Sequence, residues 1–323
     1  MAPIPIMATG QPAPASLFGV HSRATKGIGL PCRSGVDCSS TGFPRFTMTS
    51  SKIYDSSQPR RPIATELTNL WNYRGLLKLL VTRDLTVRYK RSTLGVWWTL
   101  LNPLLTMAVL WVVFSQFFRF EIPGGVPYIV YLLSGILLIT FFAQGVIATG
   151  SSIVNSSSIL SKVFVPAEVF SVSAAVSALV NFGISLMPLL VIQLVTGVGV
   201  PWTVLLVPMP AFFMLLLVAG LGLLVASAAV YFYDVLDLTA VFTQLLAYLT
   251  PTFYPISIVP ERFLPFIYAN PLYSYLVVFR GFMYEGVFAP GWTFAMMIGS
   301  SVLTVLLGIW VFTRSWKNLV VML

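Results

Sequence analysis

Basic side chains stand immediately before a long apolar stretch, and their chemistry is the attraction of anions. Arg88, Lys90 and Arg91 precede the apolar run 97–118, which begins with two tryptophans. Cationic residues beside a first membrane span stay in the cytoplasm and contact anionic lipid head groups. The cluster therefore predicts a cytoplasmic membrane face at this junction.

Aromatic side chains offer a second possible chemistry. Trp111, Phe114 and Phe118 fall on one face of the first apolar run, and Tyr248 and Tyr254 flank a later break that contains proline. Ring faces stack on the C–H edges of sugars, and tyrosine hydroxyls bond to sugar hydroxyls, so these residues predict a channel lining for a glycan. An interfacial aromatic belt or ordinary packing explains the same pattern, and the sequence leaves both interpretations open.

Enzymatic chemistry has few candidates in this chain. A single histidine and two cysteines leave little for a metal site. The sequence has no Gly-x-x-x-x-Gly-Lys-Ser/Thr phosphate loop, no His-Glu-x-x-His motif and no Gly-x-Ser-x-Gly elbow. Asp234 and Asp237 form a close acidic pair without a supporting motif, which disfavours a membrane-embedded glycosyltransferase. We expect no catalytic residue, metal or cofactor in this chain, and a separate protein as its energy source.

Composition places these residues in a helical membrane protein. The 323-residue chain is 57% hydrophobic and 9% charged, whereas soluble domains carry roughly 25% charged residues. The long apolar runs exclude an outer-membrane barrel, whose strands alternate in polarity. The net charge of +9 comes largely from basic residues beside the first span, which favours membrane lipids over nucleic acid as a partner.

Six membrane spans are predicted, because six apolar segments approach the roughly 20 residues that a bilayer needs. Their ranges are about 97–118, 128–149, 168–196, 203–232, 238–256 and 293–313. With both termini in the cytoplasm, most lysines and arginines fall on the cytoplasmic side, and the outer loops hold Arg119, Arg262 and Arg280. The pattern predicts an all-α, multi-pass protein of the cytoplasmic membrane.

The segments before the spans differ in character. Residues 1–47 are rich in Pro, Gly and Ser and are expected to be a disordered tail, or to precede the true start at Met48. The cytoplasmic segment 48–92 contains an amphipathic pattern at 63–81, which predicts an interfacial helix or a helix against a partner protein. The transmembrane domain is predicted to occupy 93–323.

The segment 257–292, between spans five and six, is too broken to cross the membrane. Its short apolar pieces are divided by Asn270 and Pro271, and they predict re-entrant helices that dip into the outer leaflet. Together with Tyr268 and Tyr273 these residues form a candidate outer gate. A surface loop with apolar anchors fits the same residues.

Three motifs, in order along the chain, resemble those of ABC-2-type polysaccharide and polyol-phosphate export permeases of the Wzm/TagG-like type. The first is Arg83-Asp84-x-x-x-Arg88-Tyr89-Lys90-x-Ser92-x-Leu94-Gly95-x-x-Trp98, followed by Asn102-Pro103-Leu104. The second contains Asn155, Ile159-Leu160, Lys162-Val163-Phe164, Pro166 and Glu168. The third contains Asp234, Gln244, Thr250-Pro251-x-x-Tyr254-Pro255, Pro260, Asn270-Pro271 and Arg280-Gly281, with Tyr233 where the family commonly has arginine.

The resemblance covers roughly residues 63–317 and implies the transmembrane subunit of an ATP-driven ABC exporter. Such a permease moves a polyprenyl-linked polysaccharide, of the O-antigen, teichoic acid or galactan type, across the bacterial cytoplasmic membrane. A homodimer paired with two copies of a separate ATPase is implied as well, with ATP and Mg²⁺ bound by the ATPase. The alternative is an ABC-2-type exporter of small hydrophobic drugs or lipids, which shares the architecture.

Roles for individual residues follow from the same resemblance. Arg88, Lys90 and Arg91 would receive the pyrophosphate or lipid head at the inner entrance, beside their role in topology. The loop after span two would form the coupling helix that contacts the ATPase, through Asn155, Ser157, Leu160, Lys162 and Phe164. A plain cytoplasmic turn fits these loop residues equally well.

Overall fold

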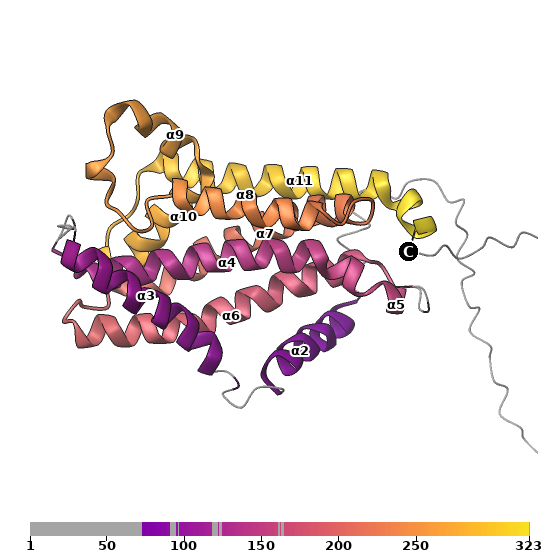
Figure 1. The fold of residues 1–323 in the computed structure, drawn as a ribbon, viewed down its shortest axis with the longest axis horizontal. Helices are drawn as coiled ribbons and strands as arrows, with labels where there is room; N and C mark the ends of the chain where they lie inside the picture. The colour runs from indigo at the N-terminus through magenta and orange to yellow at the C-terminus, as the bar shows by residue number, and fades with distance from the viewer. Residues whose placement is uncertain are drawn as a thin grey trace, which may run out of the picture. The chain divides into compact units, whose positions relative to one another are not determined.

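The described part of the chain is a bundle of helices (Figure 1). The computed structural model describes residues 73–90, 95, 97–117, 122, 125–160, 162 and 165–322, with side chains up to 315. All of them fall in one compact unit, Pro59–Leu323. Every regular element in these ranges is a helix, so the predicted all-α class is confirmed. The predicted tail 1–47 lies outside the described residues.

The order of elements alternates long helices with short connecting ones. The α-helices are α2 (Arg74–Lys90), α3 (Trp97–Phe117), α4 (Tyr128–Asn155), α5 (Ser157–Leu160), α6 (Glu168–Val195), α7 (Pro208–Ala229), α8 (Val235–Leu249), α9 (Leu264–Ala269), α10 (Pro271–Arg280) and α11 (Gly291–Met322). Three 3-10 turns occupy Trp202–Leu206, Ile256–Ile258 and Glu261–Phe263, and a π-helical turn occupies Gly281–Glu285.

Within the described residues, five segments are long and apolar enough to cross a membrane. They are Trp97–Ser115, Tyr128–Asn155, Glu168–Val195, Trp202–Ala229 and Gly291–Ser315. These agree with five of the predicted spans to within a few residues, except that α4 continues beyond 149 to Asn155. Four of the six extra residues, Gly150, Ser151, Ser152 and Asn155, are small or polar, so they lower the hydropathy at this end of the helix.

The predicted fifth span, 238–256, is shorter in the structure. Its helix, α8, has 15 residues, from Val235 to Leu249. At 1.5 Å per residue it measures about 22 Å, against a hydrocarbon thickness of about 30 Å. Thr250 is extended, with φ −83° and ψ 134°, because the following Pro251 disfavours helical backbone in the residue before it.

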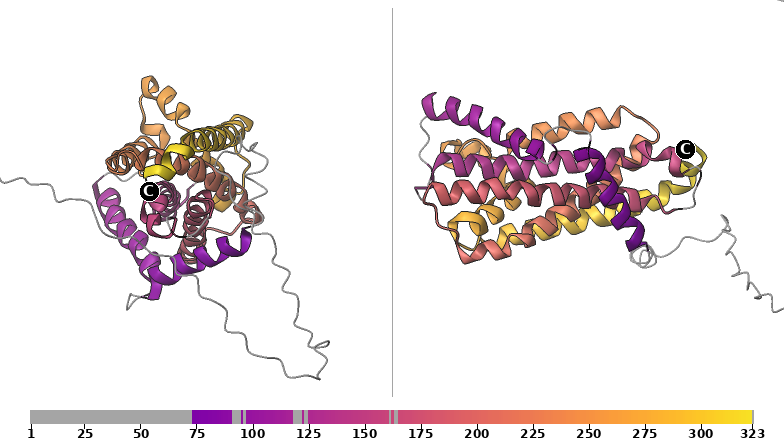
Figure 2. Two further views of the ribbon diagram at one scale, coloured as in Figure 1. Left: turned by 90° about the vertical axis from the view of Figure 1, so that its right-hand side faces the viewer. Right: turned by 90° about the horizontal axis from the view of Figure 1, so that it is seen from below.

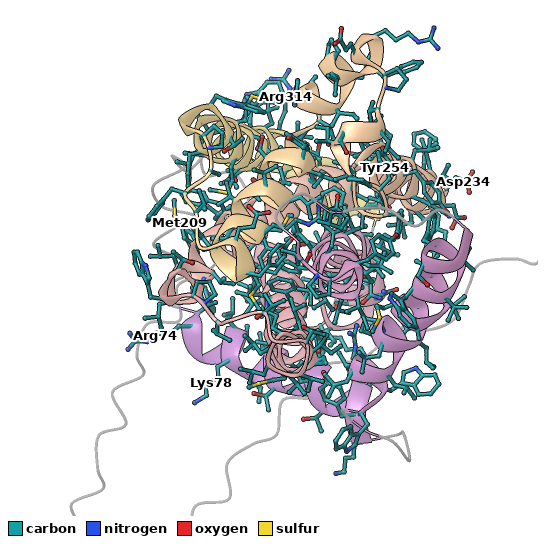
Figure 3. The ribbon with its side chains drawn as sticks, turned by 90° about the vertical axis from the view of Figure 1, so that its left-hand side faces the viewer. Arg74, Lys78, Met209, Asp234, Tyr254 and Arg314 are labelled. Atoms are coloured by element: carbon teal, nitrogen blue, oxygen red, sulfur yellow. The ribbon has the colours of Figure 1, made fainter. Side chains whose placement is uncertain are left out.

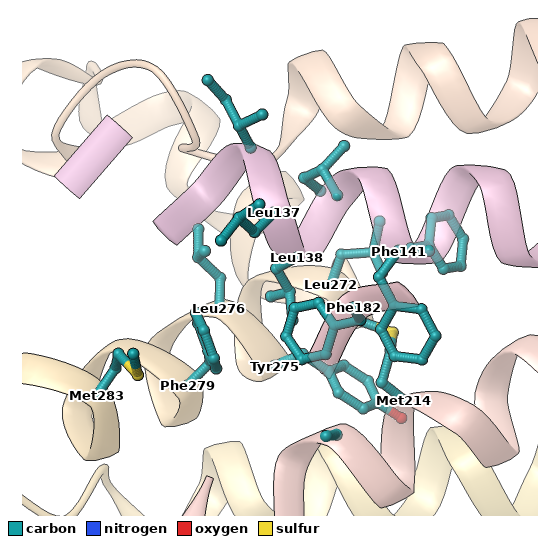
Figure 4. Packing of buried hydrophobic residues seen from close by; sticks show 14 of the residues in the cluster. Leu137, Leu138, Phe141, Phe182, Met214, Leu272, Tyr275, Leu276, Phe279 and Met283 are labelled. Carbon is teal, nitrogen blue, oxygen red and sulfur yellow. The ribbon is translucent and has the colours of Figure 1, made fainter. Parts of the chain in front are cut away.

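Helix α4 forms the centre of the bundle. In its most apolar window 78% of the residues are buried, against 11% in α3 and 17% in α11. Figure 4 shows Leu138 and Phe141 of α4 packed among Phe182, Met214 and Tyr275, which come from three other helices. The outer helices therefore leave much of their apolar surface for lipid or for another protein.

Glycine allows α7 and α11 to approach each other at backbone distance. A Cβ added to Gly220 would lie 2.4 Å from the carbonyl carbon of Thr304, and one added to Gly308 would lie 2.5 Å from the carbonyl oxygen of Gly220. Small residues at such crossings are how membrane helices gain close packing without a hydrophobic driving force.

Helix α2 lies across α6 at an angle, on the side of the bundle that faces the viewer in the right-hand view of Figure 2. Leu80 is its buried residue and packs against Val169 and Phe170 at the start of α6. Arg74 and Lys78 point away from the bundle (Figure 3). The helix ends at Lys90 rather than at 81, because the residues after Leu80, several of them basic, continue it. Arg88 and Lys90 lie in its last turn, where positive charge interacts favourably with the helix dipole.

Candidate functional site

A polar cavity of about 620 Å³ lies between α2, α3, α4 and α6. Its hydroxyl- and amide-bearing lining residues are Tyr89, Thr99, Asn102, Thr140, Gln144, Ser151, Ser152, Asn155, Ser156, Ser173, Ser177, Asn181 and Ser185. Polar side chains inside membrane helices are costly and mark ligand or ion pathways. We call this site the polar cavity.

Helical spacing explains how one wall of the polar cavity is built. Ser173, Ser177, Asn181 and Ser185 follow one another at intervals of four on α6, so they share one face of the helix. Ser177 Oγ donates to the Ser173 carbonyl at 2.8 Å, and Ser185 Oγ donates to the Asn181 carbonyl at 2.9 Å. The protons of these hydroxyls are already donated to backbone carbonyls, so the hydroxyl oxygens can accept hydrogen bonds from a ligand.

A tyrosine closes the polar cavity on the α2 side. The Tyr89 hydroxyl donates to Asn181 Oδ1 of α6. Thr99 Oγ1 of α3 donates to the Tyr89 hydroxyl at 3.3 Å. Tyr89 thus links three helices at one point. It appeared in the sequence motif between Arg88 and Lys90, but the pattern gave no indication that its partner lies on α6.

The predicted basic entrance is only partly assembled at this cavity. Arg88 lines it and is exposed, whereas Lys90 is exposed outside its lining. Arg91 lies outside the described residues. Arg83, which begins the first sequence motif but was not predicted as an entrance residue, also lines the cavity, and its Nη2 lies 2.9 Å from Asp84 Oδ1. The charges of Arg83 and Asp84 cancel, so the net positive charge at the mouth of the cavity comes from Arg88.

A second site, which we call the aromatic groove, lies between α3 and the end of α8 and has a volume of about 770 Å³. It brings together three of the predicted channel aromatics: Phe114, Tyr248 and Tyr254. Trp111 is 41% exposed and lies outside its lining, and Phe118 lies outside the described residues. The remaining lining residues are Leu105, Thr106, Val109, Leu110 and Phe253.

The predicted coupling residues surround the short helix α5. Asn155 ends α4, Ser157 begins α5, and Lys162 is exposed just beyond it. Leu160 is half-buried and packs against the cluster formed by Leu80 of α2 with Val169 and Phe170. Phe164 lies outside the described residues. Movement of α5 would therefore be transmitted to α2 and α6 through Leu160.

The predicted gate residues meet where α9 and α10 join. Asn270 is buried; its side chain accepts from the Leu272 amide at 3.1 Å and donates to Thr250 Oγ1 at 2.9 Å. It thereby caps α10, whose first residue is Pro271, and ties α10 to the end of α8. Asn270, which was predicted as a gate residue, thus caps α10 and fixes the start of that helix against Thr250.

Two tyrosine rings from the same region form a cluster with a tryptophan. Tyr268 and Tyr273 have centroids 5.5 Å apart, and Trp292 of α11 lies 5.6 and 6.1 Å from them. Sequence reasoning did not include Trp292, although it is the last residue of the segment 257–292; in the structure it lies near the start of α11. Burial raises the pKa of Tyr273 to about 12, so its hydroxyl stays neutral at physiological pH.

Sequence reasoning counted Arg280 among the residues of the outer loops and did not predict that it is buried. It ends α10 and is 6% exposed. Its Nη1 donates to the Pro251 carbonyl at 3.1 Å, and its Nη2 donates to the carbonyls of Tyr131 at 3.0 Å and Thr252 at 3.3 Å. Its Nε donates to Ser134 Oγ at 3.3 Å.

The Arg280 guanidinium also lies 3.6 Å from the centroid of the Tyr131 ring. A buried charge that is held by carbonyls and a ring face acts as a clamp. Here it binds the break after α8 to α4. Partial burial raises the pKa of the nearby Glu285 carboxyl, and Arg280 counteracts that rise.

These features define an integral membrane protein that can hold a polar ligand at one site and an apolar or ring-stacking ligand at another. In the described part of the chain, no cluster of three or more His, Cys, Asp or Glu residues could hold a metal ion. A family model described as ABC-2 type transporter matches residues 75–284, and the chain belongs to this family. It is the membrane permease of an ABC-2 exporter, a transport subunit without a catalytic domain.

Three relatives support the resemblance that was read from the motifs. An O-antigen export system permease protein RfbA from Myxococcus xanthus is 33% identical over 218 residues, which cover 67% of this chain and 83% of the relative. Two Klebsiella pneumoniae proteins of the same name are 27% identical over 220 residues and 25% identical over 247 residues. They cover 68% and 76% of this chain, and 83% and 94% of their own lengths.

Proposed function

We propose that this permease moves a lipid-linked polysaccharide across the bacterial cytoplasmic membrane, driven by a separate ATPase. The relatives named for O-antigen export supply the substrate class. The observation that carries the proposal is the aromatic groove, where Phe114 meets Tyr248 and Tyr254 from a distant part of the chain. Ring faces with hydroxyls at their edges suit a sugar polymer, because stacking tolerates sliding from one residue to the next.

The proposed topology has six spans, with both termini in the cytoplasm. The crossing that brings the number to six is α8, the fifth in chain order. The broken segment 250–256 completes its length within the protein, where irregular backbone at membrane depth is tolerated. Helix α2 then lies along the cytoplasmic interface with Arg88 and Lys90, while α9 and α10 are re-entrant helices in the outer leaflet. Cysteine accessibility at Lys162 and Arg262 would test the two faces.

The proposed assembly is a homodimer with two ATPase copies, which bind ATP and Mg²⁺. The corner from Asn155 to Lys162 is the proposed coupling contact, because it joins α4 to α6 and packs on α2 through Leu160. A displacement of this corner by the ATPase would change the shape of the polar cavity directly, since Asn155 also lines the cavity. The outer faces of α3 and α11, which are mostly unburied, are available to the second copy and to lipid.

Reconstitution of the full-length chain with its cognate ATPase in proteoliposomes tests the function. We expect a polyprenyl-diphosphate-linked glycan, added on the ATPase side, to stimulate ATP hydrolysis and to appear inside the vesicles. Stimulation by hydrophobic dyes, with no response to the glycan, would favour the exporter of small hydrophobic compounds instead.

A pair of variants on α8 tests the aromatic groove. Tyr248 and Phe242 are each 58% exposed, but only Tyr248 lines the groove. Tyr248→Ala should slow glycan movement by roughly 2- to 10-fold, the worth of one aromatic contact. Tyr248→Phe should retain most of the rate, and Phe242→Ala is the matched control. Equal rates for the two alanine variants would remove the groove from the glycan path.

A further inference from the structure

We infer that the polar cavity binds a lipid head group that combines a phosphate with several hydroxyls. The charged lining residues among those described are Arg83, Asp84 and Arg88, all on α2 at the mouth. Because Arg83 pairs with Asp84, Arg88 is the group that attracts a phosphate. Deeper in the cavity the lining is neutral, so the part of the ligand that enters carries hydroxyls rather than charge.

The inner lining suits a polyol or a sugar ring. Gln144 is exposed toward the cavity, and no hydrogen bond engages its amide in the described structure, so it can both donate and accept. Phe141 and Phe182 line the cavity and stack on each other, with centroids 4.9 Å apart and planes at 18°. The hydroxyl oxygens of α6 can accept hydrogen bonds from the polar edge of such a ring. The two phenylalanine rings can contact its apolar face.

The size and position of the cavity restrict the ligand further. A volume of about 620 Å³ lies within the roughly 300–1,000 Å³ of small-molecule pockets, so it holds a head group and not a polymer. The wall beside Arg88 is formed by α2, which lies across the bundle, and by α3, whose outer face is mostly unburied. A lipid tail can therefore stay in the bilayer while its head occupies the cavity.

Two lipids share this chemistry. One is the polyprenyl-diphosphate-linked glycan of the proposed function, for which the cavity would be the loading site. The other is a hydroxyl-bearing membrane phospholipid such as phosphatidylglycerol, for which it would be a structural site independent of the glycan. With either lipid, Tyr89 would form the α2 side of the binding site, because its hydroxyl joins α2 to Asn181 in the cavity lining.

Binding measurements on the full-length permease with its ATPase, in detergent, test the inference with three short-chain probes. Dihexanoyl phosphatidylglycerol and farnesyl-diphosphate-N-acetylglucosamine both carry phosphate and hydroxyls, and dihexanoyl phosphatidylcholine carries phosphate without free hydroxyls. We expect the first two to bind more tightly than phosphatidylcholine. The tighter of the two identifies the source of the head group.

Matched variants assign the binding to the cavity. Gln144→Leu should weaken hydroxyl-bearing probes about fivefold or more, and Arg88→Gln should weaken them roughly 10- to 100-fold. The controls are Gln244→Leu on α8, outside the cavity, and Lys78→Gln on the outward side of α2. Unchanged thermal unfolding would confirm that each variant is folded.

Equal affinity for all three probes would overturn the inference, as would unchanged binding in a folded Gln144→Leu variant. Loss of transport with head-group binding intact would count against the proposed glycan path and leave this site standing. Conversely, transport of glycan by a variant that no longer binds either head group would remove the cavity from the mechanism without affecting the proposed function.

Discussion

Replacing Arg280 by methionine should loosen the break after α8 while the long helices keep their packing. Methionine fills a similar volume and removes the charge, so the change tests the hydrogen bonds more than the space. The guanidinium reaches the carbonyls of Pro251 and Thr252, which have left the helix and have no intrahelical amide as donor. The variant therefore deprives Pro251 and Thr252 of their hydrogen bonds to α10, while Asn270 still bonds to Thr250.

The magnitude follows from which acceptors retain a donor. The Pro251 carbonyl keeps the Tyr131 hydroxyl at 3.0 Å, whereas Arg280 is the donor that the described structure gives to the Thr252 carbonyl. A buried acceptor left alone costs about 1–3 kcal/mol, and a desolvated cation–π contact is worth about 2 kcal/mol. Relief from burying a charge offsets part of this, so we expect a loss of about 3 kcal/mol.

Hydrogen exchange and thermal unfolding in detergent measure this change. The amides of 250–256 should exchange faster in Arg280→Met, with smaller effects in α4. Tyr131→Phe keeps the ring but removes the second donor to Pro251, so the double variant should cost more than the sum of the single ones. Wild-type exchange in Arg280→Met, or strict additivity in the double variant, would refute the idea of a clamp.

Three further changes test other contacts. Gly220→Ala should lower the yield of folded protein and cost at least about 1–3 kcal/mol of stability, because the new Cβ would overlap backbone atoms of α11. Gly299→Ala, which has open space around it, should be neutral. The yield of detergent-extracted protein and the melting temperature compare the two variants. Asn270→Ala should cost about 1 kcal/mol for the lost cap of α10, seen as faster exchange at the start of that helix. The pKa of Glu285 is raised in the folded protein, so stability should increase as pH falls through that pKa toward the ordinary value of 4.5; unfolding of Glu285→Gln followed against pH should lack this part of the slope.

The long helices could be predicted from the sequence because their apolar runs match the thickness of a bilayer. The length of α8 could not, since residues 250–256 carry no charge and include Phe253 and Ile256, although the helix has ended. Pro251 was visible as a break, but hydropathy alone could not say where helical backbone stops. The extension of α2 to Lys90 was missed for the opposite reason: charged residues end an apolar pattern without ending a helix.

The structural role of a residue follows from local sequence where its type determines that role, and not where a distant partner does. Asn270 before Pro271 has the sequence pattern of a helix cap, although the sequence analysis treated it only as a break and a candidate gate residue. Arg280 is not recognisable as buried, because its acceptors come from α4 and from the break after α8. Tyr89 is a similar case, since its acceptor, Asn181, lies on α6. Sequence spacing along one helix carries no information about such pairs.

Under the six-span topology, the shortness of α8 makes the membrane itself part of the mechanism. A helix of about 22 Å falls about 8 Å short of the hydrocarbon thickness, and each ångström of mismatch costs a fraction of a kcal/mol. The bilayer beside α8 must therefore become thinner, or the broken segment after Leu249 must cover the difference. Since α8 also forms one wall of the aromatic groove, a lipid-anchored ligand in the groove would cross the hydrocarbon layer where it is thinnest. Transport should therefore depend on the acyl-chain length of the surrounding lipid.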